Sequence, residues 1–166
     1  MIKNISPREA DYLLIIFEIK NNEGLPRNKD VIKKLKVSKP TASLMIKKLC
    51  DKKLITREKE YIFLTRKGLL TIFELLWRHG VIELSLDYLG LSPKEACNVS
   101  RTIELMIPFD TLVKIWEKMK KPLKCPLGFE FPNIYEVDLS KKYYICGLET
   151  LLSRKLNIHK RKLWLT

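Results

Sequence analysis

Hydrophobic positions recur at helical spacing through the first third of the chain. The pattern predicts a helix over residues 7–22, which begins at Pro7, and a second helix over residues 28–35. A third helix is predicted from Ser38 to Lys53, because Ser38 is a good N-cap and proline is tolerated in a first turn. The apolar face of this third helix consists of Ala42, Met45, Ile46 and Leu49.

Two strand-like segments follow the third helix. Leu54–Thr56 and Tyr61–Leu64 are rich in β-branched and aromatic residues, and the charged segment Arg57–Glu60 lies between them. This pattern predicts a short hairpin with Arg57–Glu60 as its turn. Three short helices followed by a hairpin are the order of a winged helix-turn-helix, which a plain three-helix bundle does not explain.

Helical patterns return after the hairpin. A long helix is predicted over residues 65–88, and Gly80 inside it indicates close packing. A capping box at Ser92 opens a helix over residues 93–106, and a further helix is predicted over residues 108–120. The second part of the chain is therefore also helical.

The hydrophobic pattern weakens beyond residue 121. Residues 122–138 read as an ordered loop or short strands, and residues 140–156 as a final short helix. The chain is thus predicted to be mainly α, with a winged helix-turn-helix DNA-binding domain at 1–68. We predict a helical dimerisation and effector domain at 69–132. A C-terminal extension with a basic tail follows at 133–166.

The charge of this 166-residue chain is distributed unevenly. Residues 1–68 carry a net charge of +9, residues 69–140 carry −2, and residues 141–166 carry +6. A basic N-terminal unit joined to a near-neutral unit is typical of a DNA-binding module fused to an assembly module, although lysine enrichment on solvated faces gives the same totals. No apolar run approaches the roughly 20 residues that span a bilayer, and no secretory signal is present, so the prediction is a cytoplasmic protein with no membrane association.

The third predicted helix and the hairpin are the candidate DNA-binding surface. Small or polar side chains at the start of a recognition helix can meet base edges, and cations along the helix and the wing can reach phosphates. Lys52 and Lys53 are further candidates for phosphate contacts. The predicted DNA-binding residues are Arg27, Ser38, Lys39, Pro40, Thr41, Ser43, Lys47, Lys48, Arg57 and Lys59.

The four cysteines form no CxxC pair, so a zinc ribbon is not indicated. The simplest interpretation is that they are reduced, mostly buried thiols. An alternative is that Cys97, Cys125 and Cys146 act as sensing thiols or soft-metal ligands together with His79, which requires at least two of them to be close in space. No nucleophile motif or phosphate loop is present, and we predict that the chain is not an enzyme.

The strings READYLLIIFEI, DVIKKLKVSKPTASLMIKKL, LITREKEYIFLTRKG, WRHGVIE and KCPLGFEFP together resemble the DtxR/MntR family of metal-responsive transcriptional repressors. The resemblance covers roughly residues 7–132. It implies a homodimer that binds a pseudo-palindromic duplex operator, with a divalent metal, usually manganese or iron, as co-repressor. The candidate cofactors of this chain are therefore manganese, iron or zinc. The resemblance also implies that metal ligands come from the first, fourth and fifth helices.

Carried over by residue, the resemblance places Asp11, His79 and Glu83 at ligand positions. Leu14 stands where the family has a second carboxylate. The fifth helix fits the family motif in two registers, one starting at Cys97 and the other retaining Glu104. The second register puts Arg101 and Leu105 at ligand positions, and the Arg101 charge could itself replace the ion and hold carboxylates such as Asp11 or Glu104. The predicted metal ligands are Asp11, His79, Glu83 and Glu104.

These observations predict a sequence-specific, DNA-binding transcriptional regulator of DtxR/MntR type, a repressor that is metal-responsive or has an altered site. One alternative is a winged-helix regulator that has lost metal control and responds to thiol oxidation or a small molecule. Another is a winged-helix assembly protein that binds a partner protein through its helix, which the positive charge of the N-terminal unit disfavours.

Overall fold

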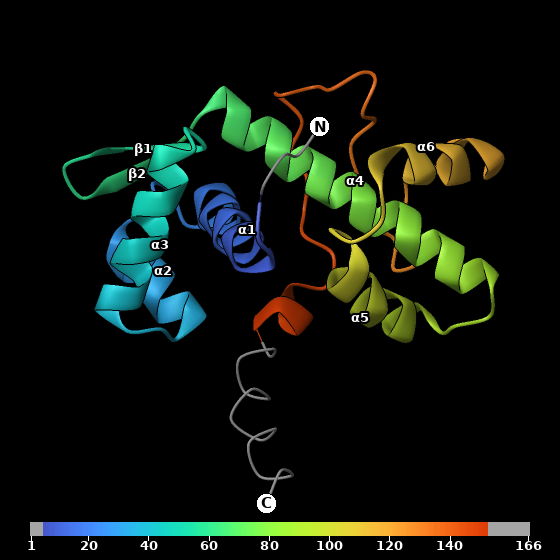
Figure 1. Cartoon of the computed structure of the whole chain (residues 1–166), viewed down its shortest axis with the longest axis horizontal. Coiled ribbons are helices and arrows are strands. Elements are labelled where there is room, and N and C mark those ends of the chain that lie inside the picture. Colours follow the sequence, from blue (N-terminus) through green and yellow to red (C-terminus); the bar gives the residue numbers. More distant parts are fainter. Residues whose placement is uncertain (1–4, 153–166) are drawn as a thin grey trace, which may run out of the picture.

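The computed structural model describes residues 5–152 of the chain. Its elements follow the order of a winged helix-turn-helix followed by a helical unit, and Figure 1 shows the long helix α4 running between the two. The elements are α1 (Pro7–Asn22), α2 (Asn28–Leu35), α3 (Lys39–Asp51), β1 (Ile55–Glu58), β2 (Tyr61–Leu64), α4 (Arg66–Tyr88), α5 (Pro93–Ile103) and α6 (Phe109–Lys118). The predicted mainly α fold with an N-terminal winged helix-turn-helix is confirmed.

Helix α1 is the centre of the N-terminal unit. Ser6 caps it through a reciprocal capping box with Glu9, and almost every side chain from Glu9 to Ile19 is buried. Helices α2, α3 and α4 all pack against it, and Figure 1 shows α1 lying between α3 and α4. Because both its faces are covered, α1 links the DNA-binding elements to the rest of the molecule.

The predicted boundaries need corrections in the N-terminal unit and after it. Helix α3 ends at Asp51 and not at Lys53, which has a positive φ of 58°. Arg57 and Glu58 belong to strand β1, so the predicted four-residue turn is wrong and the loop contains only Lys59 and Glu60. Lys59 adopts a positive φ of 52°, as tight hairpin turns require. Helix α5 ends at Ile103 and α6 begins at Phe109, with Pro108 as its N-cap, so both helices are shorter than predicted.

The segment after α6 returns across α4. Trp116 donates a hydrogen bond from Nε1 to the carbonyl oxygen of Pro122 at 2.7 Å, which fixes the start of this return. Farther along, the Phe131 side chain lies against Gly80 of α4, and the Tyr143 ring meets the Phe73 ring edge-on with centroids 5.2 Å apart. The close packing predicted at Gly80 is therefore confirmed, and its partner is the return segment.

The end of the described chain differs from the expected final helix. Residues 140–147 are not helical, and only residues 148–152 form a helical turn. The remainder of the predicted 140–156 helix, and the basic tail with it, lies outside the described residues. In the structure the non-helical chain begins directly after α6 and not at the predicted residue 133, so from here on the C-terminal extension means residues 119–152. Figure 1 shows it passing beside α4 before it reaches the neighbourhood of α5. No helix within residues 5–152 is both long enough and apolar enough to cross a membrane.

Candidate DNA-binding face and buried ligand cluster

Helix α3 has the construction of a recognition helix. The Ser38 hydroxyl caps it by accepting a hydrogen bond from the backbone N–H of Thr41, and it also lies 2.8 Å from the Thr41 hydroxyl. Ala42, Met45, Ile46 and Leu49 are buried, as predicted. Exposed side chains on the other face are those of Lys39, Ser43, Lys47 and Lys48. The helix thus presents small polar groups at its first turn and cations farther along.

The hairpin of β1 and β2 is the wing of the fold, and Arg27 joins it to the start of α2. Its guanidinium lies over the Tyr61 ring, 4.8 Å from the centroid, and donates a 3.2 Å hydrogen bond to the Tyr61 hydroxyl. A 3.5 Å ion pair with Glu60 adds to this contact. Arg27 was predicted to contact phosphate, and the structure also gives it the role of fixing the hairpin. The other predicted wing cations, Arg57 and Lys59, are exposed.

Lys52 has a different partner from the one predicted. Its ammonium group donates a 2.8 Å hydrogen bond to the buried carboxylate of Glu9, at the start of α1. Burial opposes ionisation of Glu9, but the contacts with Lys52 and Ser6 outweigh burial and lower its pKa. Lys52 therefore joins α3 to α1, and its predicted phosphate contact would have to compete with this internal ion pair.

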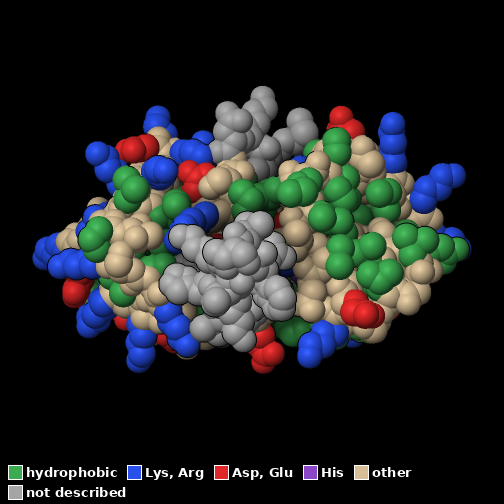
Figure 2. Space-filling model, turned by 60° about the horizontal axis from the view of Figure 1, so that its bottom comes forward, with side chains coloured by type: hydrophobic (Ala, Val, Ile, Leu, Met, Phe, Trp, Pro, Cys, Tyr) green, Lys and Arg blue, Asp and Glu red, His purple; other side chains and the backbone are tan. Residues whose placement is uncertain are grey.

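The two ends of the molecule differ in the side chains on their surfaces. Figure 2 shows lysine and arginine side chains around the end that carries α2, α3 and the hairpin, whereas hydrophobic side chains gather over the opposite end. Exposed apolar residues on the α4 and α5 side are Tyr88, Leu89, Val99 and Met106. The uneven charge of the sequence thus corresponds to an uneven surface.

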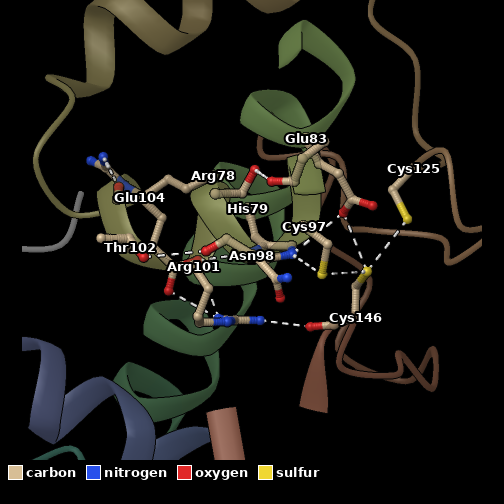
Figure 3. Close-up of polar contacts among 12 residues, drawn as sticks. Arg78, His79, Glu83, Cys97, Asn98, Arg101, Thr102, Glu104, Cys125 and Cys146 are labelled. Atoms are coloured by element: carbon tan, nitrogen blue, oxygen red, sulfur yellow. Dashed lines mark hydrogen bonds and ion pairs between the residues drawn. The ribbon is translucent and has the colours of Figure 1, made fainter. Parts of the chain in front are cut away.

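A buried cluster of metal-binding groups lies where α4, α5 and the C-terminal extension meet. His79 and Glu83 come from α4, Cys97 from α5 and Cys146 from the extension, and their ligand atoms all lie within 4.8 Å of one another. Figure 3 shows these four side chains converging on one point. We refer to them as the ligand cluster. A groove of about 610 Å³, lined in part by Cys97 and Gly147, opens beside it.

Short contacts connect the members of the ligand cluster. Cys97 Sγ lies 3.5 Å from His79 Nε2 and 3.8 Å from Cys146 Sγ. Glu83 Oε2 lies 3.2 Å from Cys146 Sγ and 3.4 Å from His79 Nε2. Outside the four, Cys125 Sγ lies 3.7 Å from Cys146 Sγ. The sequence-level alternative of a thiol cluster around His79 required at least two of these cysteines to be close, and all three are.

A second layer of polar groups holds the cluster in place (Figure 3). His79 Nδ1 lies 3.0 Å from Glu104 Oε2, and Arg101 donates hydrogen bonds to both Glu104 oxygens at 2.9 and 3.1 Å. Arg101 also donates a 2.7 Å hydrogen bond to the backbone carbonyl of Cys146. The prediction that the Arg101 charge holds Glu104 is confirmed. Arg101 thereby connects α5 to the extension next to the cluster.

The contacts within the ligand cluster shift the pKa values of its cysteine and histidine side chains. A hydrogen bond from Cys146 and the neighbouring His79 outweigh burial and lower the pKa of Cys97 to about 5. Burial and the Arg101 charge oppose protonation of His79, but its contacts with Cys97, Glu104 and Glu83 raise its pKa to about 9. Contacts with Cys125 and Cys97 raise the pKa of Cys146. Both shifts favour the thiolate form of Cys97 and the protonated form of His79.

The structure brings together only part of the predicted metal-ligand set. His79 and Glu83 are in the ligand cluster. Glu104 is not, because it contacts Nδ1 of His79, whereas the cluster lies at Nε2. Asp11, on α1, is not among the grouped ligands of the described residues. Leu14, at the position of the family carboxylate, is fully buried in the core. The described residues therefore do not bring together the oxygen-rich ligands expected for manganese. Two of the four grouped ligands are thiols instead.

Cys97 and Cys146 are both absent from the four predicted metal ligands, although both belong to the alternative of a thiol cluster around His79. Cys146 is the harder of the two to place from the sequence. Its only sequence signal is that it is a cysteine, because no spacing relates it to Cys97 or His79. The contact depends on the path of the extension, which separates Cys146 from Cys97 by 49 residues. No periodicity along the chain encodes that path.

Comparisons with known proteins agree with this architecture. Residues 4–61 match the family model described as "Iron dependent repressor, N-terminal DNA binding domain". The transcriptional regulator MntR of Escherichia coli O6:H1 is 32% identical over 103 residues, which are 61% of this chain and 66% of that protein. The chain belongs to the DtxR/MntR family. Members of this family are DNA-binding transcriptional regulators.

Solved structures extend the likeness beyond the residues that the family model matches. The hypothetical protein SSo2273 of Sulfolobus solfataricus is 28% identical, with a TM-score of 0.72 over 78% of this chain and 100% of its own. ScaR, solved with bound Zn²⁺, is 27% identical, with a TM-score of 0.71 over 80% of this chain and 63% of its own. The manganese regulator SloR is 28% identical, with a TM-score of 0.67 over 80% of this chain and 62% of its own.

Proposed function

We propose that this protein is a transcriptional regulator of DtxR/MntR type that binds duplex DNA with α3 and the wing. The observation that carries the proposal is the exposed face of α3, with its capped, small polar first turn followed by Lys47 and Lys48. Because the wing is fixed to α2 through Arg27, both elements form one rigid surface. Family membership supports the same function.

The proposed surface predicts a specific loss of DNA affinity. Replacing Lys47 and Lys48 together by alanine should weaken binding to the promoter DNA beside the protein's own gene by about 10- to 100-fold. The slope of log affinity against log salt should fall by about two, because each lysine neutralises about one phosphate. Fluorescence anisotropy with a labelled duplex at several salt concentrations measures both quantities.

A matched control removes the same charge elsewhere. Lys114 and Lys118 are exposed on α6, at the other end of the molecule, so their double alanine variant should bind as the unchanged protein does. Equal losses in both double variants would mean that only net charge matters and would contradict the role of α3. Equal affinity for single-stranded DNA of the same sequence would contradict duplex recognition.

We further propose that the regulator acts as a homodimer formed through the helical unit. Two winged units on one dimer would match two half-sites of a palindromic operator about one helical turn apart. Exposed Tyr88 and Leu89 at the end of α4, with Val99 on α5, support an apolar interface away from the DNA-binding end.

The interface makes a prediction about size in solution. Leu89 is 73% exposed in the single chain, so a Leu89→Glu change should not disturb folding but should place a charge in the dimer contact. Light scattering should give a dimer mass for the unchanged protein and a monomer mass for Leu89→Glu. Leu25→Glu, at an exposed residue of the DNA-binding unit, should remain a dimer. A monomer mass for the unchanged protein would refute the proposal.

A further inference from the structure

We propose that His79, Glu83, Cys97 and Cys146 form a site for a thiophilic divalent cation, zinc in particular, and that the C-terminal extension is a ligand-bearing part of it. The site itself does not depend on DNA binding, whereas its regulatory consequence rests on the proposed function. None of the four predicted metal ligands is a cysteine, and the sequence offers Cys146 only as one of three thiols that could bind a soft metal with His79. The choice of Cys97 and Cys146, without Cys125, comes from the geometry of this chain.

Four of the six distances between the ligand atoms are close to the edges of a zinc tetrahedron, and the other two are no longer than 4.8 Å. Two sulfur atoms on one tetrahedral zinc lie about 3.8 Å apart, a sulfur and a nitrogen about 3.5 Å, and a nitrogen and an oxygen about 3.3 Å. The corresponding distances are 3.8 Å for Cys97–Cys146, 3.5 Å for Cys97–His79 and 3.4 Å for His79–Glu83. The Cys146–Glu83 edge is 3.2 Å. One ion can therefore reach all four atoms with little movement of side chains.

Two further features of the ligand cluster favour a bound cation. Glu104 lies against His79 Nδ1, which leaves Nε2 directed at the thiols, and such carboxylate–histidine pairs commonly orient zinc ligands. Glu83 Oε1 is buried and has no hydrogen-bond partner among the described residues. A buried carboxylate oxygen without a partner is costly, and a bound cation would remove that cost. Both features indicate a positively charged ligand at this point.

The donor set determines which cation fits. Manganese prefers carboxylate, carbonyl and water oxygens, whereas thiolates select zinc and other soft ions. A donor set of two sulfurs, one imidazole nitrogen and one carboxylate oxygen is typical of zinc. Asp11 does not contribute to the cluster and Arg101 introduces a fixed positive charge beside it. This chain should therefore have a different metal preference from a manganese regulator.

The extension gives the site a physical connection to the DNA-binding unit. Three residues before Cys146, the backbone carbonyl of Tyr143 accepts a 3.2 Å hydrogen bond from the Asn21 side chain at the end of α1. The Tyr143 ring also contacts Phe73, which in turn meets Phe17 of α1 edge-on. An ion that fixes Cys146 therefore fixes this stretch against α1, on which α2 and α3 are packed.

Metal binding to the whole, chelator-treated protein tests the site directly. Titration with Zn²⁺ against a chromophoric chelator should show one tight site per chain, with Mn²⁺ at least about 100-fold weaker. Co²⁺ should produce the absorption of a tetrahedral ion with two thiolate ligands in the unchanged protein, so this measurement requires no variant to fold. Absence of a stoichiometric site, or a Co²⁺ spectrum without thiolate charge transfer, would overturn the proposal.

Cysteine variants identify the ligands. Cys146→Ser and Cys97→Ser should each lower Zn²⁺ affinity by more than about 100-fold, exceeding the roughly 10- to 100-fold typical of second-layer changes. Cys125→Ser is the matched control, because Cys125 contacts Cys146 but is not one of the four grouped ligands. It should retain one tight site. Equal affinities for Cys146→Ser and Cys125→Ser would refute the assignment of Cys146.

The regulatory consequence has a separate readout. One equivalent of Zn²⁺ should change the DNA affinity of the unchanged protein and leave that of Cys146→Ser unaltered. If zinc binds and DNA affinity stays the same, the site stands and its regulatory role is refuted. If zinc binds but no duplex preference is found, the proposed function fails while the metal site remains.

Discussion

Replacing Gly68 by alanine is expected to destabilise the protein by about 3 kcal/mol and to abolish tight DNA binding. Gly68 is in the first turn of α4, where a Cβ atom would overlap the backbone carbonyl of Leu54. That carbonyl accepts hydrogen bonds from the Thr65 hydroxyl and backbone N–H at 3.0 and 3.1 Å, which tie the hairpin to α4. The backbone of Leu54 would have to move away from the first turn of α4, and the hairpin that follows Leu54 would move with it.

Whether Gly68→Ala lowers or raises the stability distinguishes the overlap with Leu54 from the effect of helix propensity. In an ordinary helix, alanine in place of glycine stabilises by about 1 kcal/mol. The contact with Leu54 predicts the opposite sign, with a fall in melting temperature of about 5–10 °C. Thermal unfolding followed by circular dichroism measures this change. Gly90→Ala is the control, because Gly90 has a φ of 97° and no neighbour within 4 Å of its Cβ position, so only modest backbone strain is expected.

A second large effect is expected at Gly80, in the middle of α4. A Cβ atom at this position would overlap the ring of Phe131, a buried residue of the C-terminal extension. Gly80→Ala should therefore displace the extension and destabilise the protein by about 2–3 kcal/mol, again against helix propensity. Cys125 and Cys146 should then react faster with a thiol reagent, because the extension carries both.

A double-mutant cycle tests the partner assigned to Gly80. In the unchanged protein, Phe131→Ala should cost about 3–5 kcal/mol, because it empties a packed position. In the Gly80→Ala background the same change also removes the overlap, so its cost should be smaller by at least about 1 kcal/mol. Additive effects in urea unfolding would show that Gly80 and Phe131 do not interact and would contradict the packing described for the extension.

Most of the fold was predictable because its signals are local. Ser6, Ser38 and Ser92 are N-caps in the structure as in the pattern, and the periodic apolar faces of α1 and α3 are buried. The errors lie at the element ends, where tertiary contacts decide. The hairpin turn was predicted too long because Arg57 and Glu58 are charged, although charged side chains are common on an exposed strand.

The candidate site was predictable only where one helix carries the residues. His79 and Glu83 are four residues apart on α4 and so share a face, which the sequence reveals. Glu104 was predicted as a ligand, and its position behind His79 follows from the packing of α5 on α4. Cys146 depends on a loop path fixed by Phe131 and Tyr143, and such a path leaves no periodic trace in the sequence.

The separation of Cys146 from its partners also has a consequence for the order of events during synthesis. Cys146 lies 63 residues beyond Glu83 and 49 beyond Cys97, whereas α1 to β2 are complete by Leu64. Since a growing chain folds from its N-terminus, the DNA-binding unit can form well before the last ligand leaves the ribosome. A newborn chain therefore passes through a stage in which α1 to β2 have been synthesised but the proposed metal site still lacks Cys146.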